Sequence, residues 1–549
     1  MGTWTIPRAL RHCGYVLLVG GPLLVASPVR ADQPAAPLRE SDVGAVLDTA
    51  ELSATEDAWV SSARAGDNFG GDNRLYIGER PGYGAARSLV QFRMGDLDKA
   101  RAVTAAEFVL ENTTGGPSGD PARDVPIFRV DGTWDEGGVK WSNFPGTNGD
   151  RLATVSVGVG SGVHRWRSDK VTDLVRRWRL PKWQKQYLPN RGLFIQGYEA
   201  GGSHRGFGSS ESGQKPKLRL THERDEKAPV GRLKAVPRYF NAKTADGATG
   251  QSKIKLSWDF DDPAPASGVA FFRLYSQRNN QPLVLEADTI EADHFEFRGD
   301  NGVEYALVIN AVDQAGNVEP QEPAEALTLV DHQAPQVAAQ PLPPFSRGTF
   351  NVIIGGGDLP NGPGQVNAGI LWYDIVYRLD GGAWAPLVLQ STSTAVAVPD
   401  PIDGATYDFH VRAFDKAENE QPLNLGVVQA TTTIDRRPPV VTFTPVQGIS
   451  NPRFSVQWAG VDPLPGASGV ARYDIQFRIG GGVWTDWVTA STETSRVFEG
   501  AFSNVYSFRG RASDNVGNQG VYPNEAQLYV GVLDRATLTH QIRLPLLRR

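Results

Sequence analysis

Most of the chain alternates apolar and polar residues with a period of two, and turn-forming residues interrupt the alternation at short intervals. Residues 373–384 (YDIVYRLDGGAW) and 473–484 (YDIQFRIGGGVW) are typical: each alternates, turns on Gly-Gly and ends on Trp. Such a pattern predicts antiparallel strands joined by hairpins. The 60 Gly and 38 Pro supply the turns that many short strands require. The sequence therefore predicts an all-β protein.

One segment instead repeats its apolar residues at the spacing of a helix face: Val171, Leu174, Val175 and Trp178. Ser168 or Asp169 can cap its start, and Pro181 ends it. We expect a short amphipathic helix that covers one end of a sandwich, with Arg176, Arg177 and Arg179 on its outer side.

A phrase with fixed internal spacing ends three later segments: residues 304–317 (EYALVINAVDQAGN), 406–419 (TYDFHVRAFDKAEN) and 505–518 (VYSFRGRASDNVGN). In each, a Tyr precedes an Asp by eight residues and an Asn by twelve. The phrase recurs about every hundred residues, which is the length of one β-sandwich domain. Trp258 and Trp458 are expected in the cores of the first and third of these units.

Short segments in which an Asp stands four residues before a Pro precede the three units, at 225–229, 331–335 and 435–439. Because Pro fixes its own φ and extends the residue before it, these segments predict stiff joints. The predicted organisation is a signal peptide (1–31), a first module (46–222), three sandwich domains (229–331, 335–435 and 439–534) and a C-terminal tail (535–549). The three domains resemble fibronectin type III or bacterial immunoglobulin-like repeats, and this resemblance implies spacing and display rather than chemistry.

The N-terminus has the features of a secretory signal peptide: a basic start, the apolar run of residues 15–26 and a small-residue cleavage site at Ala31. An uncleaved anchor is the alternative. Cys13 is the one cysteine, so the mature chain would have no disulfide. No later segment is apolar enough for a membrane span. The formal net charge of −6 argues against a nucleic-acid partner. We expect a secreted protein that is extracellular or associated with the cell surface.

The first module carries segments with a distinctive wording and order, among them Asn68-Phe69-Gly70, Trp134-Asp135-Glu136 and the stretch from Phe207 to Glu211. Together they resemble the DNRLRE-type module, also classed as carbohydrate-binding module family 96. The resemblance implies a jelly-roll β-sandwich of an extracellular bacterial protein, and it implies polysaccharide binding, acidic glycans included.

Candidate ligand-binding residues follow from the chemistry that sugars and uronates require. Trp183 and Tyr187 come after the predicted helix in a basic loop and are the aromatic residues most expected to be exposed; Arg176, Arg179 and Lys182 supply positive charge. Residues 161–222 hold thirteen Lys or Arg and four Asp or Glu. Two interpretations stay open: a basic surface for a polyanionic glycan, or a face balanced by acids from the first half of the module.

Two sets of side chains could bind calcium. Asp57, Asn68 and Asp72 offer oxygen ligands for a structural ion in the first module. The repeated Asp of the later domains (Asp313, Asp415 and Asp514) could bind calcium at the joints or could cap turns as Asx residues. No other cofactor is expected.

The sequence holds no motif for a metalloprotease, a serine hydrolase or a phosphate-binding loop, and four sandwiches leave no segment for a catalytic domain. We therefore predict a protein that is not an enzyme, in which the first module binds extracellular polysaccharide and the repeats act as spacers. The alternative is a structural cell-surface protein or adhesin with protein partners.

Overall fold

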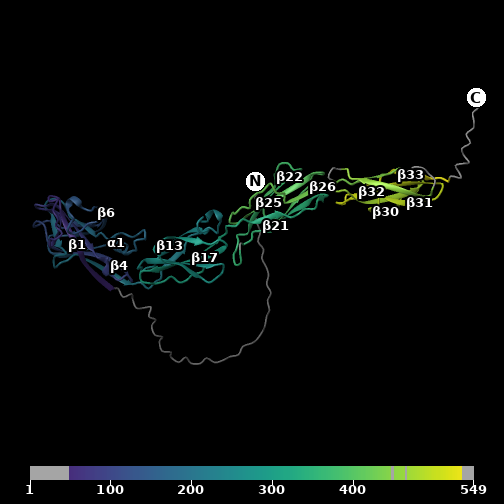
Figure 1. Cartoon of the computed structure of the whole chain (residues 1–549). Helices are drawn as coiled ribbons and strands as arrows, with labels where there is room; N and C mark the ends of the chain where they lie inside the picture. The colour runs from purple at the N-terminus through teal and green to yellow at the C-terminus, as the bar shows by residue number, and fades with distance from the viewer. Residues whose placement is uncertain (1–47, 361, 447–450, 464–466, 535–549) are drawn as a thin grey trace, which may run out of the picture. The chain divides into compact units, whose positions relative to one another are not determined.

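The computed structural model of the protein describes residues 48–360, 362–446, 451–463 and 467–534. The predicted signal peptide (1–31) and tail (535–549) lie outside the described residues. The regular secondary structure of the described chain is nearly all β, as predicted, and its strands group into a first sandwich and three smaller ones (Figure 1). No helix in this part of the chain is long and apolar enough to cross a membrane.

The first sandwich is a ten-stranded sheet folded on itself. Its strands are β1 (Asp48–Ser61), β2 (Arg74–Arg80), β3 (Gly84–Phe92), β4 (Arg101–Thr114), β5 (Arg123–Val130), β6 (Thr147–Val157), β7 (Gly162–Arg167), β8 (Leu193–Gln196), β9 (His204–Gly208) and β10 (Lys217–Arg224). Short 3-10 turns lie at Met94–Asp96 and Trp141–Asn143.

Strand β1 closes this sheet because it pairs with two different strands. Residues 48–53 pair with β10, and from Ala54 onward the strand pairs with β3, with a shift in register between Ala54 and Glu56. The pairings therefore run in a ring, β1-β10-β4-β9-β2-β3-β1. Beyond the shift, Trp59 is completely buried, as a strand enclosed on both faces requires.

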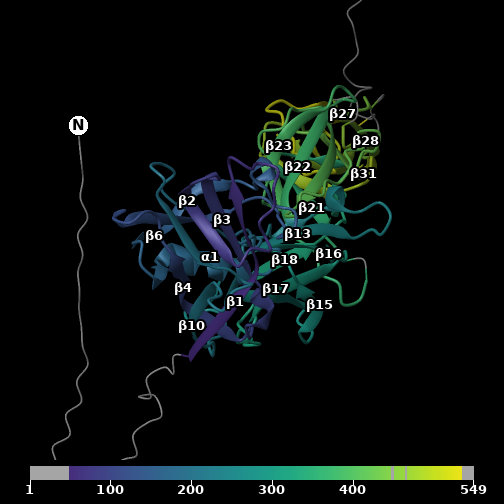
Figure 2. The ribbon, with the colours of Figure 1, turned by 90° about the vertical axis from the view of Figure 1, so that its left-hand side faces the viewer.

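The predicted helix is confirmed as α1 (Asp169–Arg179). The Ser168 hydroxyl accepts a hydrogen bond from the Val171 N–H at 3.2 Å and so caps the helix. All four apolar residues of the predicted face are buried, and the helix packs against β4, β6 and β7. Figure 2 shows α1 beside β4 and β6. The amphipathic period of 3.6 residues thus fixed both the helix and its buried face.

The three C-terminal domains repeat one strand order. The first contains β11 (Val230–Leu233), β12 (Tyr239–Phe240), β13 (Ser252–Asp261), β14 (Val269–Arg278), β15 (Val284–Ile290), β16 (His294–Gly299), β17 (Val303–Asp313) and β18 (Ala326–Val330). The second contains β19 (Gln336–Ala339), β20 (Phe345–Ser346), β21 (Phe350–Gly357), β22 (Ile370–Leu379), β23 (Ala385–Ser391), β24 (Ala395–Val398), β25 (Thr406–Asp415) and β26 (Ala430–Ile434). The third contains β27 (Val440–Phe443), β28 (Arg453–Val461), β29 (Val470–Ile479), β30 (Thr485–Ser491), β31 (Ser495–Glu499), β32 (Asn504–Asp514) and β33 (Leu528–Val532).

Each of these domains packs a three-stranded sheet on a larger one. In the first domain the sheets run β11-β13-β16 and β12-β18-β17-β14-β15, and the second domain follows the same scheme. In the described part of the third domain the larger sheet has four strands, β30-β29-β32-β33, without a counterpart of β12. In each domain one hairpin pairs two successive strands of the larger sheet: β14 with β15, β22 with β23, and β29 with β30. In immunoglobulin constant domains the equivalent of the second strand of this hairpin joins the opposite sheet. The pairing within the larger sheet is the arrangement of fibronectin type III domains. The predicted core residues Trp258 and Trp458 are each 2% exposed.

The repeated Tyr is a tyrosine corner in every domain. Tyr305, Tyr407 and Tyr506 are buried near the starts of β17, β25 and β32. Each hydroxyl accepts a hydrogen bond from the backbone N–H five residues earlier, at 2.8, 3.1 and 2.7 Å respectively. The bond clamps the turn that leads into the strand.

In each domain the repeated Asp and Asn cap the turn that follows the tyrosine-corner strand. The Asn also attaches this turn to the joint that precedes the domain. In the second domain, the Asp415 carboxylate accepts hydrogen bonds from the Asn419 N–H at 2.8 Å and from Asn419 Nδ2 at 2.7 Å. The same Nδ2 donates to the carbonyl of Asp331, in the joint, at 2.8 Å. The first and third domains repeat these bonds. The repeated Asp therefore caps this turn in each domain.

The joints also gather carboxylates around the repeated Asp, so the calcium alternative at the joints stays open beside capping. Asp225, Asp262 and Asp313 place carboxylate oxygens within 4.8 Å of one another, and equivalent triads lie at Asp331-Asp358-Asp415 and Asp435-Asp462-Asp514. Burial, helped by the charges of Asp225 and Asp313, raises the pKa of Asp262 to about 7. Burial likewise raises the pKa of Asp415 to about 6.

The Asn-to-joint hydrogen bond predicts a stability effect. Replacing Asn419 by Ala removes the side-chain donor to the buried Asp331 carbonyl and to one oxygen of the Asp415 carboxylate, which keeps its bond from the backbone N–H. We expect the second domain to lose about 2 kcal/mol of unfolding free energy in urea denaturation. Lys416→Ala, at an exposed position in the same turn, is the matched control and should change the free energy by less than about 0.5 kcal/mol. Equal effects of the two substitutions would contradict this role of Asn419.

The raised pKa of Asp262 predicts a pH dependence. Between pH 4 and about 7 the folded protein holds a proton on Asp262 that the unfolded chain has released, so stability falls as pH rises through this window. Between pH 5 and 7.5 we expect the unfolding free energy of the native first repeat domain to fall by roughly 1–2 kcal/mol more than that of Asp262→Asn. Urea denaturation of both proteins at the two pH values, with a chelator present, measures the difference. Parallel pH profiles for the two proteins would show that Asp262 is ionised in the fold.

Candidate functional site

Nearly half of the cations of residues 161–222 are paired with carboxylates within the fold. Six of the thirteen cations form ion pairs with carboxylates: Arg165, Arg177, Lys185, Arg205, Lys217 and Arg219. Glu51 and Glu107, from the first half of the module, take part in three of these pairs. Acids from the first half of the module (Glu51, Glu107 and Asp120) balance four of the thirteen cations, so the interpretation of a face balanced by these acids accounts for part of this segment.

The five predicted ligand-binding residues do not form one exposed basic surface. Arg176 donates to the carbonyl of Val103 at 2.7 Å, and Arg179 donates to backbone carbonyls between Asp98 and Arg101, so both tie α1 to the start of β4. Lys182 is exposed, and Tyr187 is partly buried. The sequence could not show that the two guanidinium groups turn back onto backbone carbonyls.

Trp183 is not the exposed platform that the sequence predicted. Its ring packs against Phe260 and Phe272 of the first repeat domain, with ring centroids 5.4 and 5.7 Å away. Its Nε1 donates to the carbonyl of Ala270 at 3.0 Å, and the neighbouring Gln184 donates to the carbonyl of Val269 at 2.6 Å. The apolar ring fills a gap in a core whose other residues come from later in the chain.

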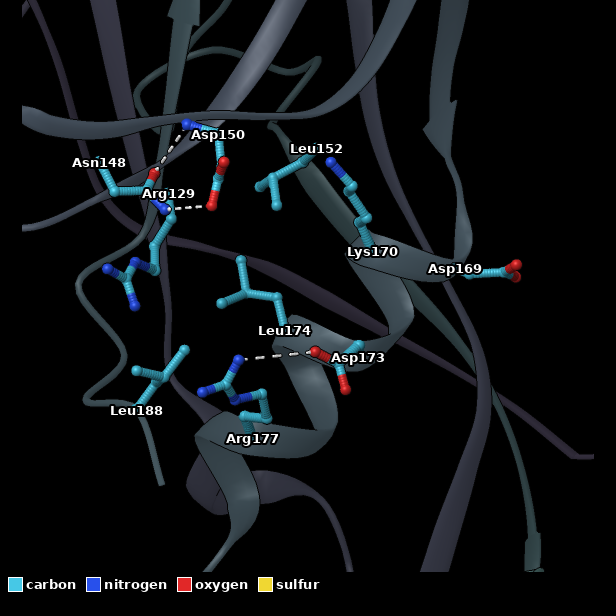
Figure 3. Close-up of a pocket in the computed structure, with 10 residues that line it drawn as sticks. All are labelled: Arg129, Asn148, Asp150, Leu152, Asp169, Lys170, Asp173, Leu174, Arg177 and Leu188. Carbon is cyan, nitrogen blue, oxygen red and sulfur yellow. Dashed lines mark hydrogen bonds and ion pairs between the residues drawn. The ribbon is translucent and has the colours of Figure 1, made fainter. Parts of the chain in front are cut away.

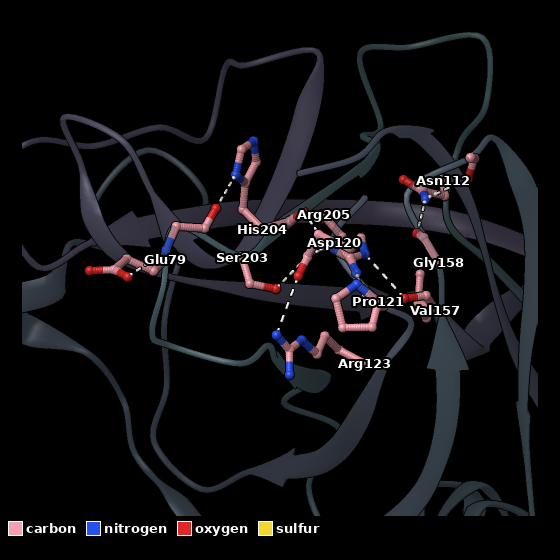
Figure 4. Close-up of polar contacts among 12 residues, drawn as sticks. Glu79, Asn112, Asp120, Pro121, Arg123, Val157, Gly158, Ser203, His204 and Arg205 are labelled. Carbon is pink, nitrogen blue, oxygen red and sulfur yellow. Dashed lines mark hydrogen bonds and ion pairs between the residues drawn. The ribbon is translucent and has the colours of Figure 1, made fainter. Parts of the chain in front are cut away.

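The side chain of Arg205 is the most deeply buried of the cations in this segment. It is 2% exposed and donates to Asp120 at 2.7 Å and to the carbonyls of Pro121 and Val157 (Figure 4). Hydrogen bonds from Ser203 and from Arg205 itself hold the pKa of Asp120 below its usual value. This network stabilises the fold and presents no charge to solvent.

Breaking the pair predicts a large loss of stability. Asp120→Asn leaves the Arg205 charge buried without a carboxylate, which typically costs about 3 kcal/mol or more. We expect a lowered midpoint of thermal unfolding for the first sandwich. Asp131→Asn, whose partner Arg129 is more exposed, is the control and should have little effect. A midpoint for Asp120→Asn within 1 °C of the native one would refute a structural role for the pair.

A pocket of about 390 Å³ lies between α1 and strands β5 and β6 (Figure 3). Three cations and three acids line it, together with Leu152, Leu174 and Leu188. Arg177 pairs with Asp173, and Asn148 bonds Asp150, so the polar groups largely satisfy one another. The lining contains no aromatic ring. The pocket therefore lacks the flat apolar face and the net positive charge that an acidic sugar would need.

A surface better suited to an acidic sugar lies at the end of β2. We call Arg64, Phe69, Tyr76, Arg80 and Tyr83 the arginine–aromatic patch. The Arg80 guanidinium lies over the rings of Tyr76 and Tyr83, 3.8 and 4.2 Å from their centroids, and Arg64 lies over Tyr83 at 4.3 Å. Arg64 is exposed, and the other four side chains are half-buried.

Local structure explains how these side chains meet. Tyr76 and Arg80 are four residues apart in β2, so they point to the same face of the strand. Gly82, with a φ of 76°, allows the tight turn that returns Tyr83 beside them. Underneath, the buried ring of Trp59 stacks on Phe69 with centroids 4.1 Å apart.

The two arginines of the patch differ from other ring-stacked arginines of this sandwich. Arg87 lies over Trp141 but pairs with Glu199, and Arg123 lies over Tyr198 but pairs with Asp120. Within the described residues, Arg64 and Arg80 have no ion pair with a carboxylate. A guanidinium held in place by a ring and lacking an acidic partner is suited to bind an external carboxylate.

Of the three predicted calcium ligands, only Asp57 lies in a group of carboxylates among the described residues. The Asp72 carboxylate accepts a hydrogen bond from Trp59 Nε1 at 2.8 Å. The Asn68 amide donates to the carbonyls of Glu136 and Val139 at 2.7 and 2.8 Å. Asp57 lies instead beside Glu136 and Glu211. Glu136 and Glu211 stand in segments that carried the family resemblance, so the sequence held a signal for this group. The spacing expected of a calcium-binding loop did not reveal it.

Comparison with known families supports the resemblance of the first sandwich. Residues 48–222 match the model of carbohydrate-binding module family 96. The match confirms the resemblance seen in the sequence and covers every strand of the first sandwich. It also places the arginine–aromatic patch within a segment related to carbohydrate-binding modules.

For the three C-terminal domains, comparison with solved structures adds little to what the strand order shows. The FN1–FN3 domains of chicken CNTN1 are similar to 55% of this chain and are covered over 98% of their own length, with 15% sequence identity and a TM-score of 0.23. At that score, the fibronectin type III assignment depends on the sheet topology described above. No curated protein matches the chain.

Proposed function

We propose that the protein is a secreted, non-catalytic polysaccharide-binding protein whose first sandwich binds an acidic glycan across the arginine–aromatic patch. The observation that carries the proposal is the placement of Arg80 over Tyr76 and Tyr83 without a carboxylate partner. The half-buried rings can stack on the apolar faces of sugars, and the two guanidinium groups can pair with uronate carboxylates. The family match of residues 48–222 supports carbohydrate as the ligand class.

In this proposal the three fibronectin type III-like domains are spacers that hold the binding sandwich away from its point of attachment. The repeated Asn bonds to each joint support a spacer with stiff connections. Secretion is inferred from the N-terminal sequence pattern, which lies outside the described residues.

Retardation in native gels containing a polyuronate tests the site. We expect the native protein to be retarded, and more strongly at low salt because exposed charges are screened less. Arg80→Ala should weaken binding about five- to thirtyfold, which corresponds to the loss of one charge-assisted contact of about 1–2 kcal/mol. Binding of Arg80→Ala at native strength would place the site elsewhere.

Lys182→Ala is the matched control, because it removes one exposed cation outside the patch from the region that the sequence favoured. Its affinity should equal that of the native protein. A selective loss in Lys182→Ala would move the site to the loop after α1. Absence of binding to every glycan of a broad array would favour the alternative, a structural surface protein or adhesin with protein partners.

A further inference from the structure

Three acidic side chains from distant parts of the first sandwich meet beside the arginine–aromatic patch. Asp57 belongs to β1, Glu136 to the loop after β5, and Glu211 to the loop between β9 and β10. One carboxylate oxygen of each lies within 4.8 Å of one oxygen of the others. None of the three forms an ion pair with Lys, Arg or His among the described residues.

The buried carboxylate of Asp57 has an unsatisfied oxygen. The residue is 0% exposed. Its Oδ2 accepts a hydrogen bond from the Ser210 N–H at 2.7 Å, whereas its Oδ1 is buried and has no hydrogen-bond partner in the described structure. A buried carboxylate oxygen is costly unless it is hydrogen-bonded, paired with a cation or bound to a metal. Two further carboxylates beside it increase that cost.

The geometry of the group suits one hard cation. Calcium binds oxygen ligands at about 2.3–2.6 Å, so two ligands on opposite sides of one ion lie at most about 5 Å apart. The carboxylate oxygens already meet this limit. The Ser210 hydroxyl donates to Glu211 Oε1 at 2.8 Å and lies 3.5 Å from Glu136 Oε1, which adds a neutral oxygen to the group. The absence of nitrogen and sulfur among these ligands disfavours zinc.

The loop that carries Glu136 is held in position by its neighbours. Asn68 donates two hydrogen bonds to backbone carbonyls of this loop, at Glu136 and Val139. Gly70 allows the close approach, because a Cβ at this position would lie 2.2 Å from the Glu136 carbonyl oxygen. Asn68 is therefore a positioning residue here, and the turn that contains it also carries Phe69 of the patch.

From this arrangement we infer that Asp57, Glu136 and Glu211 bind one Ca²⁺. The ion offsets three carboxylates that have no cationic partner and links β1 to two loops. It also fixes the turn of residues 68–70 against the loop of Glu136, and so supports one side of the arginine–aromatic patch. The site does not depend on glycan binding.

Calorimetric titration of the chelator-treated full chain with CaCl₂, in the absence of glycan, tests the inference. Glu211→Gln is the primary variant, because Glu211 is exposed and its loss leaves the fold intact. We expect this variant to bind one ion fewer than the native protein, or to bind that ion at least tenfold more weakly. Ions bound by the Asp triads of the joints are the same in both proteins, so the difference isolates this site. Glu223→Gln, on the same sandwich, should titrate like the native protein.

Thermal unfolding of Asp57→Asn gives a second readout. The substitution keeps an oxygen that can accept from Ser210 and removes the buried charge, so in chelator the variant should unfold at the native midpoint or above. Calcium should raise the midpoint of the native first sandwich by several degrees and leave that of the variant unchanged. Equal calcium shifts in native protein, Asp57→Asn and Glu211→Gln, with identical titrations, would overturn the inference. Since no glycan is present, that outcome would leave the proposed glycan binding unaffected.

Discussion

The change of partner along β1 is the constraint on which the first sandwich depends. Its first residues pair with β10, and its later residues pair with β3, so one strand joins both sides of the sheet into a ring. The shift after Ala54 sets the register of everything that follows. It places Trp59 under the aromatic rings of the patch and Asp57 among the acids. The proposed glycan surface and the inferred cation site are thus consequences of one backbone path.

Features fixed by local pattern were predictable from the sequence. Period-two alternation predicted the strands, and the helical spacing ending at Trp178 predicted α1 together with its buried face. The repeated Tyr and Asn marked equivalent turns, and the structure explains them through a hydrogen bond to the backbone and a hydrogen bond to the joint. Each of these interactions is made within a few residues or within one repeated unit, so the sequence records it directly.

The candidate site was less predictable, because it depends on which distant segments become neighbours. Nothing local to Arg219 shows that Glu51 and Glu107 will neutralise it, and nothing local to Arg80 shows that it will remain unpaired. The net charge of residues 161–222 therefore overstated how much basic surface the folded protein exposes. Composition describes a stretch of chain, whereas recognition depends on the few charges that remain without partners once the sheet has formed.

Trp183 has a practical consequence for dissecting the protein. Its indole leaves the first sandwich and completes the core formed by Phe260 and Phe272 of the following domain. A cut between the two domains would uncover a large apolar ring on one fragment and open a gap in the other. Such fragments are liable to aggregate for reasons unrelated to recognition. The smallest reliable piece for biophysical work is the pair of domains expressed together.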